Sequence, residues 1–171
     1  CTRYLKEKQK KNYIPKCMFL SGDSGKNIKN GTAFGVKERN KLIMQALYGE
    51  GNKDPQEIGK GVAALYGIAD KGFNVISNQF STHYFFKDKS TLLEFARNLS
   101  ENCKIGGFVI GTCYDGSKIF NLLKDKKPNE TIVKKNNTGE IIWKMTKRFD
   151  GNDIKPDVSS LGLEIDIYQE S

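Results

Sequence analysis

The segment 73–123 alternates between two kinds of apolar pattern, and this alternation limits the folds that are open to the chain. Short apolar runs at 73–80 (FNVISNQF) and 108–113 (FVIGTC) predict two buried strands. Apolar residues at helical spacing follow each run, at 88–102 and at 115–123. Strand, helix, strand and helix in this order predict a parallel sheet covered by helices, which makes this an α/β protein.

The residues before this segment give a weaker pattern. Residues 1–12 predict the end of a Lys-rich helix, and the apolar run 17–20 predicts a short strand followed by a turn. Further helices are predicted at 41–48 and at 62–66. Because residues 37–72 are rich in glycine, we expect them to form a surface insertion.

After residue 124 the pattern becomes that of antiparallel strands. The runs 131–134 and 140–149 flank Asn-Asn-Thr-Gly at 136–139, a turn sequence that is typical of a β-hairpin. The alternating residues 161–168 (LGLEIDIY) predict a last strand. We therefore expect C-terminal antiparallel strands beside the α/β segment.

Composition excludes some classes of protein and leaves others open. The net charge of +8 favours polyanionic partners, although a merely lysine-rich soluble surface explains it as well. The four cysteines lack CxxC spacing and there is one histidine, so we expect no metal site and a reducing compartment. We expect no signal peptide and no membrane span, and the missing initiator Met suggests a chain that begins inside a longer protein.

The turn after the 73–80 strand gathers residues that suit a flat, charged ligand. Gln79, Phe80, His83 and Tyr84 follow one another closely there, with two more phenylalanines. A lone histidine is usually structural, but aromatic faces at a strand end can stack on a cationic ring such as a methylated purine. Asp23 also follows a predicted strand. Its carboxylate can accept a hydrogen bond from an adenine amino group or a ribose hydroxyl there, or it can serve only as the cap of a helix or turn.

The segment 22–25 (GDSG) copies the surroundings of a trypsin-like serine nucleophile, but a catalytic triad is not expected. In that fold the histidine precedes the serine, whereas His83 follows Ser24 here. We therefore do not assign a protease activity.

Several segments together resemble the mRNA cap guanine-N7 methyltransferase family. FNVISNQFSTHYFF resembles that family's F-D-x-x-S-x-Q-F-x-x-H-Y signature, which is specific, and KIGGFVIGTCYDG resembles its P-G-G-x-F-I-G-T segment. The GDS tripeptide at 22–24, the Arg3-Tyr4 pair and the late strands GEIIWKMTKRF and LGLEIDIYQES are also similar. The resemblance covers nearly the whole chain in the right order. The sequence is most similar to the methyltransferase region of giant-virus multifunctional capping enzymes.

The resemblance implies a class I, Rossmann-like methyltransferase fold, here truncated and lacking its first strands. Residues 1–171 would be a partial cap methyltransferase domain, with 37–72 as its surface insertion. The cofactor would be S-adenosylmethionine. Its binding residues would be Asp23 and Ser24 at the adenine, Gln79 and Phe80 beside the methyl donor, and Tyr84 between donor and acceptor.

The resemblance also implies a cap site and a positioning role for two residues. Arg3 would contact the phosphate or ribose side of the cap and His83 the guanine, while Tyr114 stands where cellular enzymes usually have Pro. His83 and Tyr84 would position the reactants, because guanine N7 has its own lone pair and needs no general base.

The partners implied are the capped mRNA 5′ end and the guanylyltransferase and triphosphatase domains of a capping enzyme. The location implied is intracellular: a cytoplasmic viral factory or virion if viral, the nucleus if cellular. We expect the chain alone to be inactive, because the Gly-rich donor loop and a guanine-binding glutamate of the family have no counterpart here. Two alternatives remain: another class I methyltransferase, and a non-catalytic methyltransferase-like scaffold domain of a capping complex.

Overall fold

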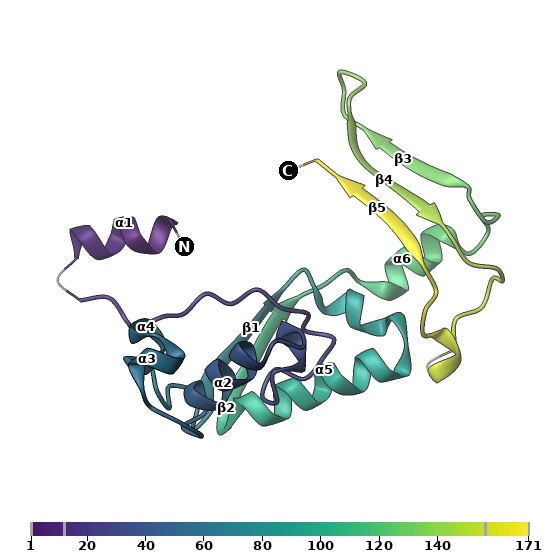
Figure 1. Cartoon of the computed structure of the whole chain (residues 1–171). Coiled ribbons are helices and arrows are strands. Elements are labelled where there is room, and N and C mark those ends of the chain that lie inside the picture. The colour runs from purple at the N-terminus through teal and green to yellow at the C-terminus, as the bar shows by residue number, and fades with distance from the viewer. Residues whose placement is uncertain (1, 12, 156, 171) are drawn as a thin grey trace. The chain divides into compact units, whose positions relative to one another are not determined.

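The computed structural model describes residues 2–11, 13–155 and 157–170 of the chain. The chain divides into two compact units (Figure 1). Unit 1 comprises Cys1–Ile76 and Glu94–Phe108, and unit 2 comprises Ser77–Leu93 and Val109–Ser171. The helices and strands of the mixed α/β fold are α1 Thr2–Lys10, α2 Glu38–Leu47, α3 Pro55–Ile58, α4 Lys60–Ala63, β1 Phe73–Gln79, α5 Lys89–Asn102, β2 Cys103–Thr112, α6 Gly116–Leu123, β3 Thr131–Lys135, β4 Ile141–Lys147 and β5 Ile165–Gln169, with 3₁₀ turns η1 Thr32–Phe34, η2 Thr82–Lys87 and η3 Val158–Ser160.

The apolar core of unit 1 lies on α2. Met44, Leu47, Tyr48 and Ala69 are buried together, and partly buried side chains such as Phe34 pack against them. Met44, Leu47 and Tyr48 lie at helical spacing at the C-terminal end of α2, which explains why that face of the helix turns inward. Part of the 37–72 segment thus supplies buried core residues; its description as an insertion stays a prediction.

A polar network on α5 completes unit 1. Asn98 is 4% exposed; its side chain accepts a hydrogen bond from the Ile28 N–H and donates to the carbonyls of Ser24 and Lys26. The Tyr48 hydroxyl donates to Asn102, whose side chain in turn donates to the Asn98 carbonyl. Because these groups are buried, their hydrogen bonds fix the loop 24–28 against α5.

β1 and β2 form a two-stranded parallel sheet, joined through α5. A Cβ atom placed on Gly111 would lie 2.5 Å from the carbonyl oxygen of Asn78, so glycine is needed for the strands to approach. β2 begins at Cys103, five residues before the start that we predicted, and α5 ends immediately before it.

Two predictions about strands are wrong. β1 and β2 were expected to be buried, yet Val75 is 51% exposed and Phe108 is 68% exposed, because a sheet of two strands leaves its faces largely uncovered. The predicted strand at 17–20 is irregular, since no strand among the described residues lies beside it to pair with its backbone. Phe19 contacts Tyr4 of α1 edge to face instead, with 5.9 Å between ring centroids.

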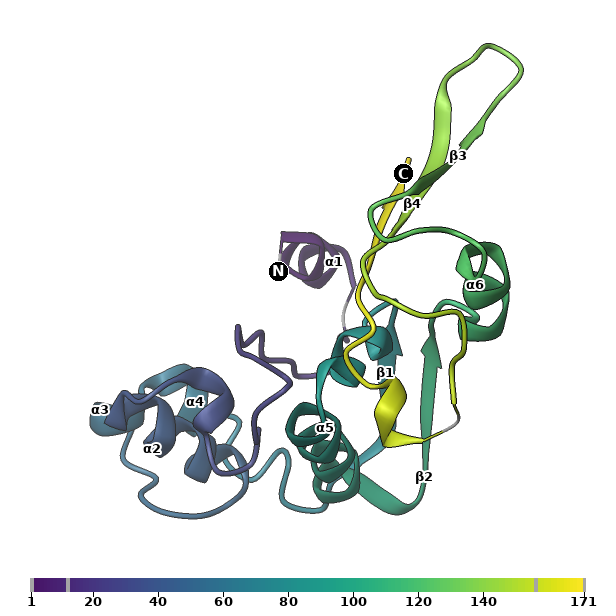
Figure 2. The same cartoon turned by 90° about the vertical axis from the view of Figure 1, so that its right-hand side faces the viewer.

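Unit 2 contains a three-stranded antiparallel sheet in the order β3-β4-β5, which confirms the predicted hairpin and last strand (Figure 2). The Asn136 side chain accepts hydrogen bonds from the N–H groups of Thr138 and Glu140 and so stabilises the turn. The N-terminus of α6 is capped by Asp115, which accepts from the Lys118 N–H. That hydrogen bond lowers the pKa of the Asp115 carboxyl.

Lys147 is buried where β4 meets the residues after α6. Only 1% of its surface is exposed, and its Nζ donates to the carbonyls of Lys126 and Gly151, at 2.9 and 2.7 Å. It also lies 4.8 Å from the centre of the Phe149 ring. A buried ammonium group needs such partners, so Lys147 ties β4 to two connecting segments.

We predict that Lys147→Met lowers the free energy of unfolding by about 3 kcal/mol, because the carbonyl groups around Nζ would stay buried without a donor. Urea denaturation measures the change. Lys144→Met on the same strand is the control; its exposed ammonium lies over Tyr168, so we expect a loss below about 1 kcal/mol. Equal losses for both variants would contradict the structural role of Lys147.

We predict that Tyr48 makes stability depend on alkaline pH. Burial and the charge of Glu101 raise the pKa of Tyr48 to about 12, and the hydrogen bond that its hydroxyl donates to Asn102 offsets only part of this rise. The Tyr48 hydroxyl therefore loses its proton near pH 10 in the unfolded chain and near pH 12 in the folded chain. Its contribution to the free energy of unfolding is complete below pH 10 and is lost as the pH rises from 10 to 12. Ultraviolet titration should show a late-ionising fraction among the seven tyrosines, and Tyr48→Phe should reduce that fraction. An unchanged titration curve in the variant would refute this.

Candidate functional site

The turn that leaves β1 has an unusual backbone. Phe80 adopts a φ of 51°, in the left-handed region that a bulky residue rarely enters. Its N–H donates to the carbonyl oxygen of Thr112 at 2.9 Å, which joins the ends of β1 and β2. The Ser81 hydroxyl donates to the Asn78 side chain and closes the turn. Backbone strain of this kind persists where surrounding contacts hold it, and it is common at binding sites.

Four aromatic rings meet at these two strand ends. The centroid of the His83 ring lies 4.3 Å from that of Tyr84 and 5.3 Å from that of Tyr114. The rings of Phe80 and Tyr114 are 6.2 Å apart. Phe80 and Tyr84 are 60% and 69% exposed, so their faces are open to a ligand. Phe80, His83, Tyr84 and Tyr114 are called the aromatic cluster below.

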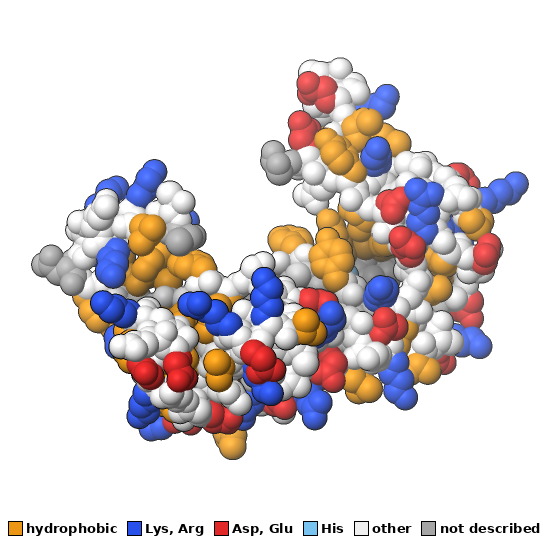
Figure 3. All heavy atoms as spheres, viewed as in Figure 1, with side chains coloured by type: hydrophobic (Ala, Val, Ile, Leu, Met, Phe, Trp, Pro, Cys, Tyr) orange, Lys and Arg blue, Asp and Glu red, His pale blue; other side chains and the backbone are white. Residues whose placement is uncertain are grey.

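The aromatic cluster forms one wall of a cavity of about 940 Å³ inside unit 2. The opposite side of the lining comes from α6, from Phe149 and from β5 with the residues before it, namely Ile119, Phe120, Leu123, Ile154, Ser160, Gly162, Leu163, Glu164, Ile165, Ile167 and Gln169. Apolar side chains gather around the hollow beside α6 and β5 (Figure 3). Its size and its mainly apolar lining suit a small organic ligand.

One polar atom in the cavity wall lacks a partner. The Nδ1 atom of His83 is buried and makes no hydrogen bond to any of the residues that the structure describes. Buried polar atoms are rarely left unpaired, so this nitrogen is suited to bind a ligand atom. Lys87 and Glu164 also line the cavity and bring one charge of each sign.

Gln79, a predicted cofactor residue, is already engaged by its own sheet. Its Oε1 accepts a hydrogen bond from the Thr112 hydroxyl at 2.8 Å, and its Nε2 donates to the Ser77 hydroxyl at 3.0 Å. Gln79 therefore braces the ends of β1 and β2. Its contact with a methyl donor stays a prediction.

The other predicted residues belong to unit 1. Asp23 is exposed; its Oδ1 accepts from the Gly25 N–H at 2.9 Å, and its Oδ2 lies 3.8 Å from Lys26 Nζ. The Ser24 carbonyl is held by Asn98 on α5. Arg3 lies exposed on α1. The predicted roles of Asp23, Ser24 and Arg3 stay predictions, because these residues and the aromatic cluster lie in different units.

Sequence reasoning missed the far walls of the cavity. The α6 residues Ile119 and Phe120 carried only a helical pattern, which does not show which face meets a ligand. Ile165 and Ile167 could have been found, because the alternation of β5 places both on one face. Asn98 gave no signal, since a mid-helix Asn is read as a surface residue.

Metal and membrane features are not found in the described part of the chain. Within residues 2–11, 13–155 and 157–170, no three His, Cys, Asp or Glu side chains are placed to hold a metal ion. No helix in the same ranges is long and apolar enough to span a membrane.

Comparison with known proteins gives a family. The sequence model of the mRNA (guanine-N(7))-methyltransferase domain matches residues 2–170. The chain is also 28% identical over 114 residues to a "Probable mRNA-capping enzyme" of Acanthamoeba polyphaga mimivirus; that alignment covers 66% of the chain and 9% of the relative. The chain thus matches only a small part of that relative's length. Because the family match runs through nearly every residue, the chain belongs to the mRNA (guanine-N7)-methyltransferase domain family.

Proposed function

We propose that this chain acts as part of a larger capping enzyme, which transfers a methyl group from S-adenosylmethionine to N7 of the guanine in the mRNA cap. The observation that carries the proposal is the cavity of unit 2, in which the aromatic cluster provides stacking faces and His83 an unpaired nitrogen. A purine needs both: apolar faces above and below the ring, and polar groups at its edge. Family membership supports the same reaction.

The aromatic cluster suits the charge change of the reaction. Guanine becomes positively charged when N7 is methylated, and the faces of Tyr84, Tyr114 and Phe80 attract a cation placed over them. The transition state already carries part of this charge. The cluster therefore binds it more tightly than it binds neutral guanine, which is the condition for catalysis.

Asp23 and Ser24 fit the donor better than Gln79 does. The exposed Asp23 carboxylate keeps lone pairs free to accept a hydrogen bond from an amino or hydroxyl group, and Asn98 holds its loop in place. The Gln79 amide already uses one donor on Ser77 and one acceptor lone pair on Thr112. When bound, S-adenosylmethionine would supply the methyl group on a positively charged sulfur. The chain's part would be to orient guanine N7 through His83 and Tyr84 and to exclude water from the cavity.

The wider assignments follow from this activity. We propose the capped 5′ end of mRNA as the substrate and guanylyltransferase and triphosphatase domains as partners, with Arg3 on the phosphate or ribose side of the cap. The similarity to a viral capping enzyme supports a protein that acts where transcripts are made, inside a cell or virion.

We predict that Tyr84→Ala weakens binding of the unmethylated cap dinucleotide GpppG about tenfold to a hundredfold, because stacking of an aromatic ring on a base contributes about 1–3 kcal/mol. Calorimetric titration measures this. Tyr168→Ala removes an exposed tyrosine of the same unit outside the cavity and should leave the affinity unchanged. If Tyr84→Ala bound GpppG as tightly as the unchanged chain, the cavity would not be the cap site. Methyl transfer by the full-length protein would decide against the scaffold alternative.

We predict that Asp23→Asn weakens binding of S-adenosylmethionine about tenfold to a hundredfold and leaves GpppG affinity as it is. The carboxylate would lose a charged hydrogen bond, which is worth about 1.5–3 kcal/mol. Equilibrium dialysis with labelled donor gives the dissociation constants, and Asp153→Asn is the control for loss of an exposed carboxylate. The donor role of Asp23 fails if both variants bind S-adenosylmethionine equally.

A further inference from the structure

A row of three side chains crosses the antiparallel sheet from the cavity to its outer edge. The register pairs Lys134 of β3 with Trp143 of β4, and Trp143 with Gln169 of β5. Residues paired in this way share one face of a sheet. Gln169 lines the cavity, so Trp143 and Lys134 extend that face toward β3, the edge strand.

Charge is distributed unevenly across this sheet. Residues 124–148, which include β3 and β4, contain eight Lys or Arg and three Asp or Glu. Residues 161–170, which include β5, contain Glu164, Asp166 and Glu170 and no Lys or Arg. Even without the buried Lys147, the β3 side is therefore the basic side of the sheet, and a polyanion is attracted to it.

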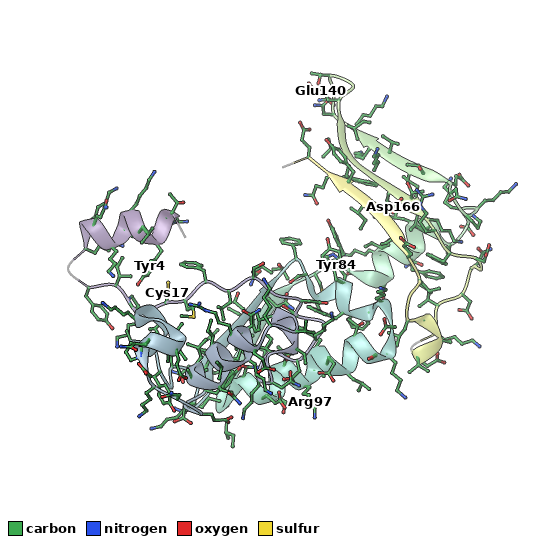
Figure 4. The ribbon with its side chains drawn as sticks, viewed as in Figure 1. Tyr4, Cys17, Tyr84, Arg97, Glu140 and Asp166 are labelled. Carbon is green, nitrogen blue, oxygen red and sulfur yellow. The ribbon has the colours of Figure 1, made fainter. Side chains whose placement is uncertain are left out.

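The lysines at the outer end of the row are not neutralised. Within the described ranges, Lys134 and Lys135 form no ion pair and are exposed, whereas Lys126 pairs with Glu130 and Arg148 pairs with Asp166. Glu140 lies at the tip of the hairpin (Figure 4), where the Asn136 and Thr138 side chains donate hydrogen bonds to it. The positive charge of β3 is free to meet anions from outside.

We propose that the row Lys134–Trp143–Gln169 binds single-stranded RNA that leaves the cavity, with a base stacked on Trp143 and a phosphate held by Lys134. The inference rests on the proposed function, because it takes the cavity as the place where the transcript begins. An aromatic ring beside unneutralised lysines is the arrangement that binds single strands without regard to sequence, since every base offers a flat face and every nucleotide a phosphate. An acidic peptide would use the lysines and leave the indole unused.

Trp143 is the chain's single tryptophan, so its fluorescence reports on the row directly. The probe is an uncapped RNA of about ten nucleotides with mixed sequence, titrated at several salt concentrations. We expect saturable quenching of Trp143 and an affinity that falls with salt. Lys134→Gln should weaken binding several-fold and reduce the slope of log affinity against log salt by about 0.7, the value for one phosphate contact on a single strand.

Two further variants complete the test. Lys41→Gln removes an equally exposed lysine from α2 and should change neither affinity nor slope. Trp143→Leu, followed by the anisotropy of labelled RNA, should weaken binding about fivefold to a hundredfold. Circular dichroism confirms that each variant is folded.

Identical slopes for Lys134→Gln and Lys41→Gln, or no quenching, would overturn the inference; the β3 lysines would then serve only to keep the edge strand from pairing with other chains. The probe has no cap and no methyl transfer is measured. A negative result in the RNA titration therefore does not affect the conclusion from the GpppG titration of Tyr84→Ala. A negative result in the GpppG titration likewise does not affect the conclusion from the RNA titration.

Discussion

The hydrogen bond from the Phe80 N–H to the Thr112 carbonyl is the contact on which the site depends. It joins the last residues of two parallel strands, so whatever follows each strand is delivered to the same place. His83 and Tyr84 follow β1, and Tyr114 follows β2. The left-handed backbone at Phe80 turns the chain sharply enough to bring its ring beside that of Tyr114. The absence of a side chain at Gly111 lets the two strands approach closely enough for this contact to form.

The other half of the cavity depends on the antiparallel sheet. β5 provides apolar residues to the lining, and β4 holds β5 by a regular ladder. Lys147 fixes the end of β4 to the segment after α6, so the helix and the sheet that line the cavity are joined by one buried ammonium group. A charged residue thus holds together a mainly apolar pocket, because backbone carbonyls surround its head group.

Local patterns predicted most of the elements and failed where burial depends on distant neighbours. The helical spacing at 88–102, the hairpin and the last strand all appear in the structure, since each depends on residues close in sequence. The apolar runs of β1 and β2 suggested buried strands, but the structure leaves Val75 and Phe108 exposed. The run at 17–20 fails for a similar reason, because a strand needs a partner whose position its own residues do not specify.

The sequence by itself determined the family, through the order and spacing of its motifs, and it also indicated the residues of the aromatic cluster. Those residues lie at strand ends, and the end of a strand can be predicted from the pattern of residues close to it in the sequence. Only the tertiary structure decided that Gln79 accepts a hydrogen bond from Thr112, that Asn98 holds the loop of Ser24, and that α6 and β5 line the cavity. These contacts join residues far apart in the chain, and such contacts form only when the whole unit packs.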